Sequence, residues 1–481
     1  MNAASASELI IQGNATHTST GIQLTPAEPS QFGGLYINGI SFSPINGLHV
    51  EFEYDMKGGT SLGGSYGDGL SFFLYDGSIT SPSIGSPGAG LGYTYNRTNE
   101  QFSNLRKAGL TGAYLGIALD QFGNFKYKRF QAESRVNGIQ RSSFEPIENS
   151  HVTLRGAKGQ TLTNLTYMGL GEGFAGYPVL ITRSTLTNTA TSGKVLQSDG
   201  TFANTTNTLS STFSLRNTNN EFRKVYLDLI PHFETPTFAN GFDVKVDIQT
   251  DADTPPINVI NYYHYKTSVF YYENANPAET DYNNDIVESS SFPRNLNTTV
   301  PSVLKLGFAA STGQSYQEHI IKNVKLTLPY SAVTNDDEVS TCKNQSVQIP
   351  VFDNDIAYKG PISITIPPTG SKDNIDYKTF SFTKNSDTDL TLYRKKTTPQ
   401  GTWSFNTNTG IVTFTPSNGF TGTSTMTYSI KGRTVIDLLS GKIIEPYGDT
   451  AYRSVPSTIT VKLENIGCNV KSNRMVSQGI K

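Results

Sequence analysis

An alternation of apolar and polar residues, repeated in many segments, is the feature that most limits the fold of this chain. Every second residue is apolar in residues 48–54 and again in residues 242–248. Successive side chains of a β-strand point to opposite faces, so this period indicates strands with one buried and one hydrated face. Residues 70–75 are apolar at almost every position, which indicates a central strand covered on both faces. Because no segment of three or more turns has the apolar spacing of an amphipathic helix, we predict an all-β chain.

A change in the strand pattern predicts two domains within the 481 residues. A strand at residues 324–328 ends at Pro329, and the polar, acidic segment 334–338 follows. Shorter strands with regular turn signals come after it, as in an immunoglobulin-like sandwich. We therefore expect a large jelly-roll sandwich over residues 1–330, a linker at 331–337, an immunoglobulin-like sandwich over 338–470 and an unstructured tail at 471–481.

The charge balance and composition narrow the class of partner and the compartment. The chain has 38 basic and 40 acidic residues, a net charge of −2, and only 16% charged residues. No basic face is implied, so nucleic acid is not expected as a partner. No run of about 20 apolar residues is present, so membrane insertion is not expected. The first residues lack a signal-peptide pattern, yet the low charge and dense turns are typical of extracellular β proteins. We expect a secreted or cell-surface protein whose targeting segment is missing from this sequence; a cytosolic protein is the alternative.

The two cysteines of the chain stand at the ends of the second predicted domain. Cys342 opens it and Cys468 closes it. A disulfide between them would suit an exported protein. Two unpaired thiols are the alternative, because the sequence does not supply the geometry that a disulfide requires.

Three segments of the first domain carry a recognisable pattern when they are taken in order. They are Gly-Asp-Gly-Leu-Ser-Phe-Phe-Leu at residues 67–74, Leu-Gly-Ile-Ala-Leu-Asp-Gln-Phe-Gly-Asn at 115–124 and Leu-Gly-Phe-Ala-Ala-Ser-Thr-Gly at 306–313. This pattern resembles the L-type carbohydrate-binding domains, the legume-lectin-like or concanavalin A-like family, and the resemblance implies a concanavalin-like jelly roll. In the second domain, segments 351–355 and 412–422 resemble the bacterial immunoglobulin- or cadherin-like modules of surface adhesins.

The resemblance implies a shallow sugar site in the loops of the first domain. Asp68, Phe122 and Asn124 match the family's sugar-binding positions. A carboxylate accepts hydrogen bonds from sugar hydroxyls, an amide both donates and accepts, and an aromatic ring covers the C–H face. The glycine loop formed by Gly88, Ala89 and Gly90 matches the backbone donor, and Gln314, Ser315 and Tyr316 match the variable wall. The alternative is that Asp68 and Asn124 are only turn residues, a role that both types favour.

The same resemblance implies a calcium ion beside the sugar site. Asp120, Asn124 and the carbonyl of Phe122 match its ligands, and calcium prefers such oxygen donors. Two positions depart from the family: Ala118 replaces the glutamate that holds a transition metal, and Arg129 replaces a second aspartate. We therefore expect no transition metal there and regard calcium as possible but weakly held.

Carbohydrate binding by an exported bacterial surface adhesin, with a glycan on a cell or polymer surface as partner, is the function these observations favour. An adhesion module that has lost its sugar site, with a structural or protein-binding role, is the alternative. A glycoside hydrolase of the same fold is disfavoured, because residues 117–122 contain none of the glutamates that a retaining pair requires. The six histidines form no close pair in the sequence, so a zinc hydrolase motif is lacking.

Overall fold

A computed structural model describes most of the chain. The described residues are 9–38, 41–42, 44, 47–97, 106–126, 149–162, 173–189, 191–218, 221–235, 238–266, 268–272, 293–327, 331–357, 370–383, 391–432, 435–436, 443–444, 454 and 456–464.

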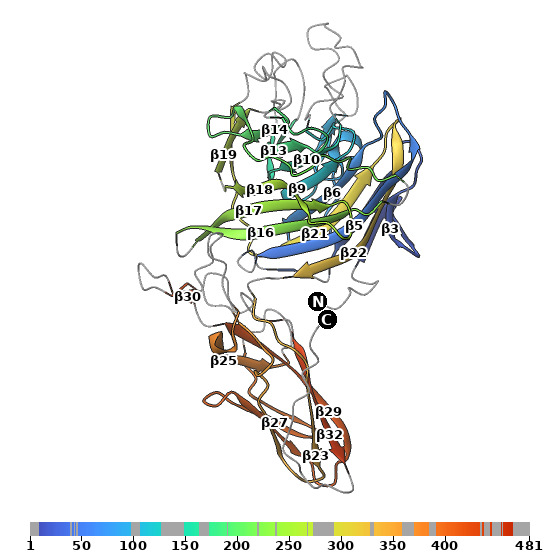
Figure 1. Cartoon of the computed structure of the whole chain (residues 1–481). Coiled ribbons are helices and arrows are strands. Elements are labelled where there is room, and N and C mark those ends of the chain that lie inside the picture. Colours follow the sequence, from blue (N-terminus) through green and yellow to red (C-terminus); the bar gives the residue numbers. More distant parts are fainter. Residues whose placement is uncertain are drawn as a thin grey trace. The chain divides into compact units, whose positions relative to one another are not determined.

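The predicted all-β fold class is confirmed. The described residues contain strands and short 3₁₀ turns but no α-helix. Accordingly, the described part of the chain has no helix with the length and apolar character needed to span a membrane. The chain divides into two compact units (Figure 1), the first comprising residues 1–44, 48–232 and 240–327 and the second 45–47, 233–239 and 328–481.

A nine-stranded sheet forms one layer of the first unit. Its order is β1 (Leu9–Gly13), β4 (Phe32–Ile37), β21 (Leu304–Ser311), β6 (Gly69–Asp76), β9 (Ala113–Asp120), β10 (His151–Arg155), β13 (Val179–Ser184), β14 (Gly193–Leu196) and β15 (Phe202–Asn204). β6 lies between β21 and β9, and its residues from Gly69 to Tyr75 are all buried. The strand expected at residues 70–75 is therefore central and covered on both faces.

A seven-stranded sheet forms the second layer. Its order is β18 (Ile257–Tyr265), β17 (Phe238–Gln249), β16 (Lys224–Thr235), β5 (Leu48–Thr60), β22 (Tyr316–Thr327), β3 (Gly21–Thr25) and β2 (Thr16–Thr18). The apolar side chains of its alternating strands meet those of the first sheet. Phe52 of β5 packs edge-on against Phe308 of β21, with ring centroids 5.1 Å apart, and Phe242 of β17 packs against Tyr114 of β9. These contacts join the two sheets into a β-sandwich (Figure 1).

Loops cover the other face of the nine-stranded sheet, which explains why β6 and β9 are buried on both sides. Leu91, Tyr93, Leu110 and Tyr177 from these loops form one hydrophobic cluster with Phe73 of β6 and Ala118 of β9. The side-chain hydroxyl of Ser71 donates to the carbonyl of Leu91 at 2.6 Å. The outer side of this sheet is therefore a second core, and the loop ends near β6 and β9 rest on it.

The second unit is a smaller β-sandwich of two four-stranded sheets. One sheet has the order β23 (Asp337–Cys342), β32 (Ser457–Glu464), β29 (Gly422–Gly432) and β25 (Ile375–Phe382), and the other has β24 (Val347–Ile349), β28 (Ile411–Pro416), β27 (Gly401–Asn406) and β26 (Lys395–Thr398). β23 and β32 are parallel. Phe380 of β25 stacks on Phe405 of β27 across the core, with ring centroids 3.7 Å apart, and Trp403 is fully buried beside them.

Small two-stranded pairs complete the described strands. They are β7 (Asn96–Arg97) with β8 (Arg106–Lys107), β11 (Lys158–Leu162) with β12 (Gly173–Gly176), β19 (Ser268–Tyr272) with β20 (Pro293–Asn297), and β30 (Val435–Ile436) with β31 (Ile443–Ile444). Cys342, at the end of β23, is disulfide-bonded. Cys468, the other cysteine of the chain, lies outside the described residues.

Candidate functional site

Asp68 lies just before β6, where three chain segments meet. The peptide bond between Gly67 and Asp68 is cis. The N–H of Asp68 donates to the carbonyl of Ser311 at 2.8 Å, and the N–H of Phe122 donates to the carbonyl of Asp68 at 2.8 Å. Main-chain hydrogen bonds therefore join the start of β6, the loop after β9 and the end of β21.

The loop after β9 is closed by the side chain of Asp120. Its Oδ1 accepts the N–H of Gly123 at 2.9 Å, and its Oδ2 accepts the N–H of Lys126 at 3.1 Å. Arg155, fully buried, donates from Nε to the carbonyl of Phe125 at 2.9 Å and lies over the Phe125 ring. Protein groups therefore hold the loop that carries Phe122 and Asn124.

Two buried oxygens at these loop ends have no hydrogen-bond partner among the described residues. They are Oδ2 of Asp68 and Oδ1 of Asn124, whose residues are 6% and 5% exposed. Phe122 is partly exposed, and its ring lies next to Gly67, the residue before Asp68: a Cβ placed on Gly67 would lie 3.1 Å from it. An acceptor buried without a partner costs about 1–3 kcal/mol. A ligand hydroxyl that donated to either oxygen would recover this energy.

The charge of Asp68 is sensitive to its surroundings. Burial, and after it the nearby carboxylate of Asp120, raise the pKa of Asp68 to about 7, against a hydrogen bond from Ser311 that lowers it. Burial also raises the pKa of Asp120, although the charge of Lys126 and three main-chain N–H groups oppose this. The site therefore holds two aspartates of which one, Asp120, is committed to the loop itself.

The predicted glycine loop and Asp68 both make hydrogen bonds to Ser311. Residues Gly88–Gly90 form a 3₁₀ turn. The N–H of Gly88 donates to Oγ of Ser311 at 2.7 Å, and the N–H of Gly90 donates to the carbonyl of Pro87 at 3.3 Å. The turn is thus fixed beside Asp68. Among the described residues, the N–H of Ala89 is the one N–H group of this turn without a hydrogen bond.

One of the three residues expected to form a variable wall is buried in the fold. Ser315 is buried, and its hydroxyl donates to the carbonyl of Ser65. The hydroxyl of Tyr316, at the start of β22, accepts a hydrogen bond from Oγ1 of Thr60 at 3.1 Å. Gln314 is exposed. Of this predicted wall, the structure therefore presents Gln314 to solvent and leaves Tyr316 partly exposed.

The donors at the expected calcium position fit a calcium ion poorly. Asn124 Oδ1 is open, but both carboxylate oxygens of Asp120 already accept main-chain N–H groups. Lys126 is fully buried, with Nζ 3.1 and 3.2 Å from the ring nitrogens of His151, and its positive charge acts on Asp120. A buried ammonium repels a second cation. Arg129 lies outside the described residues, and Ala118 packs in the outer hydrophobic cluster.

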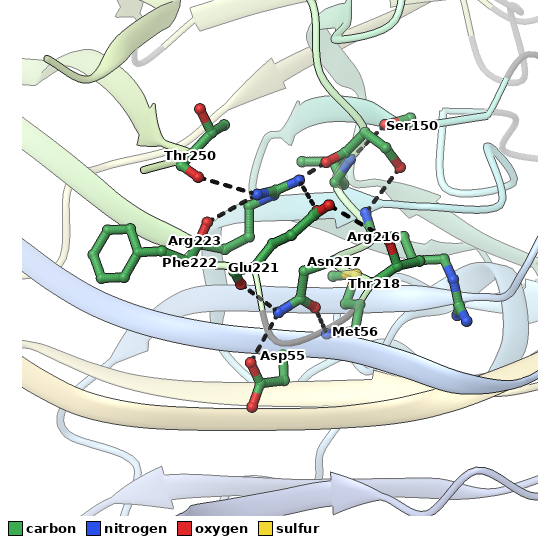
Figure 2. Close-up of polar contacts among 12 residues, drawn as sticks. Asp55, Met56, Ser150, Arg216, Asn217, Thr218, Glu221, Phe222, Arg223 and Thr250 are labelled. Atoms are coloured by element: carbon green, nitrogen blue, oxygen red, sulfur yellow. Dashed lines mark hydrogen bonds and ion pairs between the residues drawn. The ribbon is translucent and has the colours of Figure 1, made fainter. Parts of the chain in front are cut away.

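The loop that carries Arg216 and Asn217, which the sequence analysis did not single out, contacts the segments that hold the site. Oε1 of Gln121 accepts the N–H of Arg216 at 2.9 Å, and the Arg216 guanidinium lies 3.5 Å above the centre of the Tyr66 ring. Asn217, fully buried, accepts the N–H of Met56 at 2.6 Å and donates to Oδ1 of Asp55 at 2.9 Å (Figure 2). The loop is thereby attached to β5. No local sequence pattern marks these contacts.

His319 is a structural residue of this region. It is fully buried in β22, with Nδ1 2.7 Å from Oγ1 of Thr25 and Nε2 3.2 Å from Nε2 of Gln317. Burial, together with the charge of Arg216, lowers the pKa of His319 to about 3. His319 is therefore neutral at physiological pH and joins β22 to β3.

No protein-family model and no curated protein sequence matches the chain. Solved structures of similar topology include the exoplasmic/lumenal domain of VIP36 with Ca²⁺ and Man3GlcNAc bound, at 12% identity and a TM-score of 0.33, covering 67% of this chain and 86% of that one. Lectin I-B4 from Griffonia simplicifolia, in its metal-free form, has 12% identity and a TM-score of 0.33, covering 68% and 95%. The lectin from Bauhinia forficata in complex with GalNAc has 12% identity and a TM-score of 0.32, covering 68% and 94%.

Proposed function

We propose that the first unit binds a carbohydrate at the loop ends that carry Asp68, Phe122 and Asn124. The observation that supports this most is the pair of buried, unpartnered acceptors, Oδ2 of Asp68 and Oδ1 of Asn124, beside a partly exposed aromatic ring. Sugar hydroxyls are donors that satisfy such acceptors, and the amide of Asn124 donates in return. The Phe122 ring would cover a C–H face of the sugar, and the N–H of Ala89 would add a main-chain donor.

The two-domain organisation supports an adhesion role for the whole chain. The segments 351–355 and 412–422 that resemble bacterial adhesin modules belong to the second unit. We therefore propose a secreted or cell-surface bacterial adhesin in which an L-type lectin-like domain precedes an immunoglobulin- or cadherin-like domain. The partner would be a glycan of a cell or polymer surface.

The proposed binding is not accompanied by hydrolysis. A retaining hydrolase needs two carboxylates that both reach the scissile bond. Asp120 is the carboxylate whose charge acts on Asp68. It is fully buried and accepts the main-chain N–H groups of Gly123 and Lys126. Burial and these hydrogen bonds fix Asp120 inside its own loop, where it does not reach a bound sugar as a nucleophile or as a general acid.

We further propose that this loop holds its shape without calcium. The charge of buried Lys126 offsets that of Asp120, and Arg155 fixes the carbonyl of Phe125. These groups perform the two tasks of a metal ion in such a loop, which are charge compensation and attachment of the main chain. The positive charge of Lys126 would oppose a calcium ion at this loop.

One observation favours a second function, that of a structural or protein-binding module whose sugar site is closed. Asp68 and Asn124 are only 6% and 5% exposed, so a ligand reaches them only if the neighbouring loops allow it. This alternative keeps the sandwich and the second unit and predicts no sugar affinity.

A glycan array probed with the full chain, in millimolar calcium and in EDTA, separates the two functions. The lectin proposal expects a defined set of bound glycans in both conditions, and Asp68→Ala should abolish that binding while the melting temperature stays within a few degrees. An array without a hit in either condition supports the closed-site alternative. A large loss of stability in Asp68→Ala would instead assign Asp68 to the turn.

A further inference from the structure

Three potential metal ligands that are distant in the sequence converge on the seven-stranded sheet. His232 is on β16, Asp243 on β17 and His264 on β18, three strands that are neighbours in this sheet. In the register of β17 and β18, Asp243 lies opposite His264. Nδ1 of His232 is 2.8 Å from Oδ2 of Asp243, and the His232 and His264 rings stack with centroids 3.5 Å apart. One ligand atom from each residue lies within 4.8 Å of the others.

The cluster lies on the face of the sheet that points away from the sandwich core. Phe242 and Val244, on either side of Asp243, are fully buried in the core, and alternate residues of a strand point to opposite faces. The side chain of Asp243 is nevertheless only 5% exposed, whereas that of His232 is 31% exposed. The carboxylate is therefore almost fully covered, whereas His232 remains partly open to water.

We propose that His232, Asp243 and His264 bind one divalent transition-metal ion, with Zn²⁺ as the best fit. Two imidazole nitrogens and one carboxylate oxygen are a donor set that zinc takes, with bonds of about 2.0–2.2 Å. Ligand atoms at that distance from one centre are about 3.4 Å apart in a tetrahedral shell. Separations within 4.8 Å reach this value by small side-chain rotations. Water completes the shell on the exposed side.

This site differs from the family position that Ala118 occupies, because Ala118 is on β9 of the other sheet. The site has no sequence motif, because its ligands are eleven and twenty-one positions apart in the sequence and meet through strand pairing. A bound ion would link β16, β17 and β18 at the edge of the sheet. Because the ion binds only where the three strands are paired, it stabilises the folded state.

A second histidine on the same face provides a matched control. His49 of β5 lies 2.6 Å from Oδ1 of Asp228 and 3.2 Å from Oε1 of Glu51. Nζ of Lys224 is 2.7 Å from Oε2 of Glu51, and Nζ of Lys325 is 3.5 Å from Oε1 of Glu51. Two ammonium groups thus already neutralise this cluster and oppose a further cation.

The test uses the full chain without an affinity tag, stripped with EDTA and dialysed. Isothermal titration with ZnCl₂ gives stoichiometry and affinity, thermal unfolding gives the stabilisation, and Co²⁺ in place of Zn²⁺ reports tetrahedral coordination through its visible absorption. The variants are His264→Gln, Asp243→Asn and His232→Gln, with His49→Gln as the control. Circular dichroism of each metal-free variant establishes that it is folded.

The wild type should bind one zinc ion per chain, unfold at a higher temperature with zinc, and give intense Co²⁺ bands. Each ligand variant should lose more than about tenfold in zinc affinity, whereas His49→Gln should behave as the wild type. The proposal is overturned if the wild type takes up no zinc, if folded ligand variants bind it as tightly as the wild type, or if His49→Gln loses as much affinity as they do.

Discussion

The N–H of Phe122 donates to the carbonyl oxygen of Asp68 at 2.8 Å. The two loops that carry the proposed sugar-binding side chains are thus joined through their main chains, and substitution of either side chain leaves that bond intact. Binding and folding can therefore be separated at Asp68, which is not possible where a side chain itself closes a turn.

Asp68→Asn should weaken glycan binding without destabilising the first unit. The loss of charge-assisted hydrogen bonds to sugar hydroxyls should cost about 1.5–3 kcal/mol of binding free energy, roughly a 10- to 150-fold rise in Kd. Stability at pH 8 should stay level or rise, because burial already disfavours the Asp68 carboxylate. Isothermal titration with a glycan from the array and thermal unfolding measure the two effects. Asp76→Asn, at the other end of β6, is the control, and equal losses of affinity in both variants would contradict the prediction.

Lys126→Met should destabilise the first unit, whereas calcium should not affect the wild type. Removing one partner from a buried charge pair costs about 3–5 kcal/mol, and Lys126 is fully buried near the Asp120 carboxylate. Urea unfolding followed by near-ultraviolet circular dichroism measures this cost. In the wild type, the midpoint should be the same in millimolar calcium and in EDTA. A calcium-dependent rise in the wild-type midpoint would show that calcium, not Lys126, compensates Asp120.

Asn217→Ala should detach the loop that supports the site. Its Oδ1 accepts the N–H of Met56, and its Nδ2 donates to Asp55 and to the carbonyl of Glu221 (Figure 2). Leaving these groups buried and unpartnered should cost about 2–4 kcal/mol of unfolding free energy. Asn204→Ala is the control, because Asn204 is exposed and bonds only to the Lys194 side chain among its described side-chain contacts. It should cost less than about 0.5 kcal/mol, and a similar cost in both variants would argue against the network.

The stability of the first unit should fall in mild acid because of His319. Burial lowers its pKa in the folded state to about 3, whereas unfolded histidine has a pKa near 6.5. Below pH 6.5 the unfolded state therefore binds more protons than the folded state. The unfolding free energy keeps its full value above that pH and decreases as the pH falls toward 3. Between pH 7 and pH 5 the loss should be about 2 kcal/mol.

The His319 contribution is measured as the difference between the wild type and His319→Gln across that pH range. The comparison is necessary because His49, beside Asp228 and Glu51, has a raised pKa and contributes with the opposite sign. In His319→Gln, the decrease in unfolding free energy between pH 7 and pH 5 should be smaller than in the wild type by about 2 kcal/mol. An identical pH profile in both proteins would mean that His319 takes up a proton while folded.

The alternation of apolar and polar residues determined the all-β fold class, because strand periodicity is a local property of the chain. The central position of residues 70–75 followed from the same pattern, and β6 is indeed buried on both faces. The loop from Asp120 to Asn124 is also local, so its residues could be named from the sequence alone.

Only the tertiary structure decided which of these side chains remain available and what partners they have. Ser315 is buried against Ser65, and Nζ of Lys126 lies beside the ring of His151. His232 and His264 meet across three strands. Each of these relationships depends on strand register and on the packing of loops from distant parts of the chain. A pattern of neighbouring residues carries no information about such pairings, because they are set by the free energy of the whole sandwich rather than by local conformational preference.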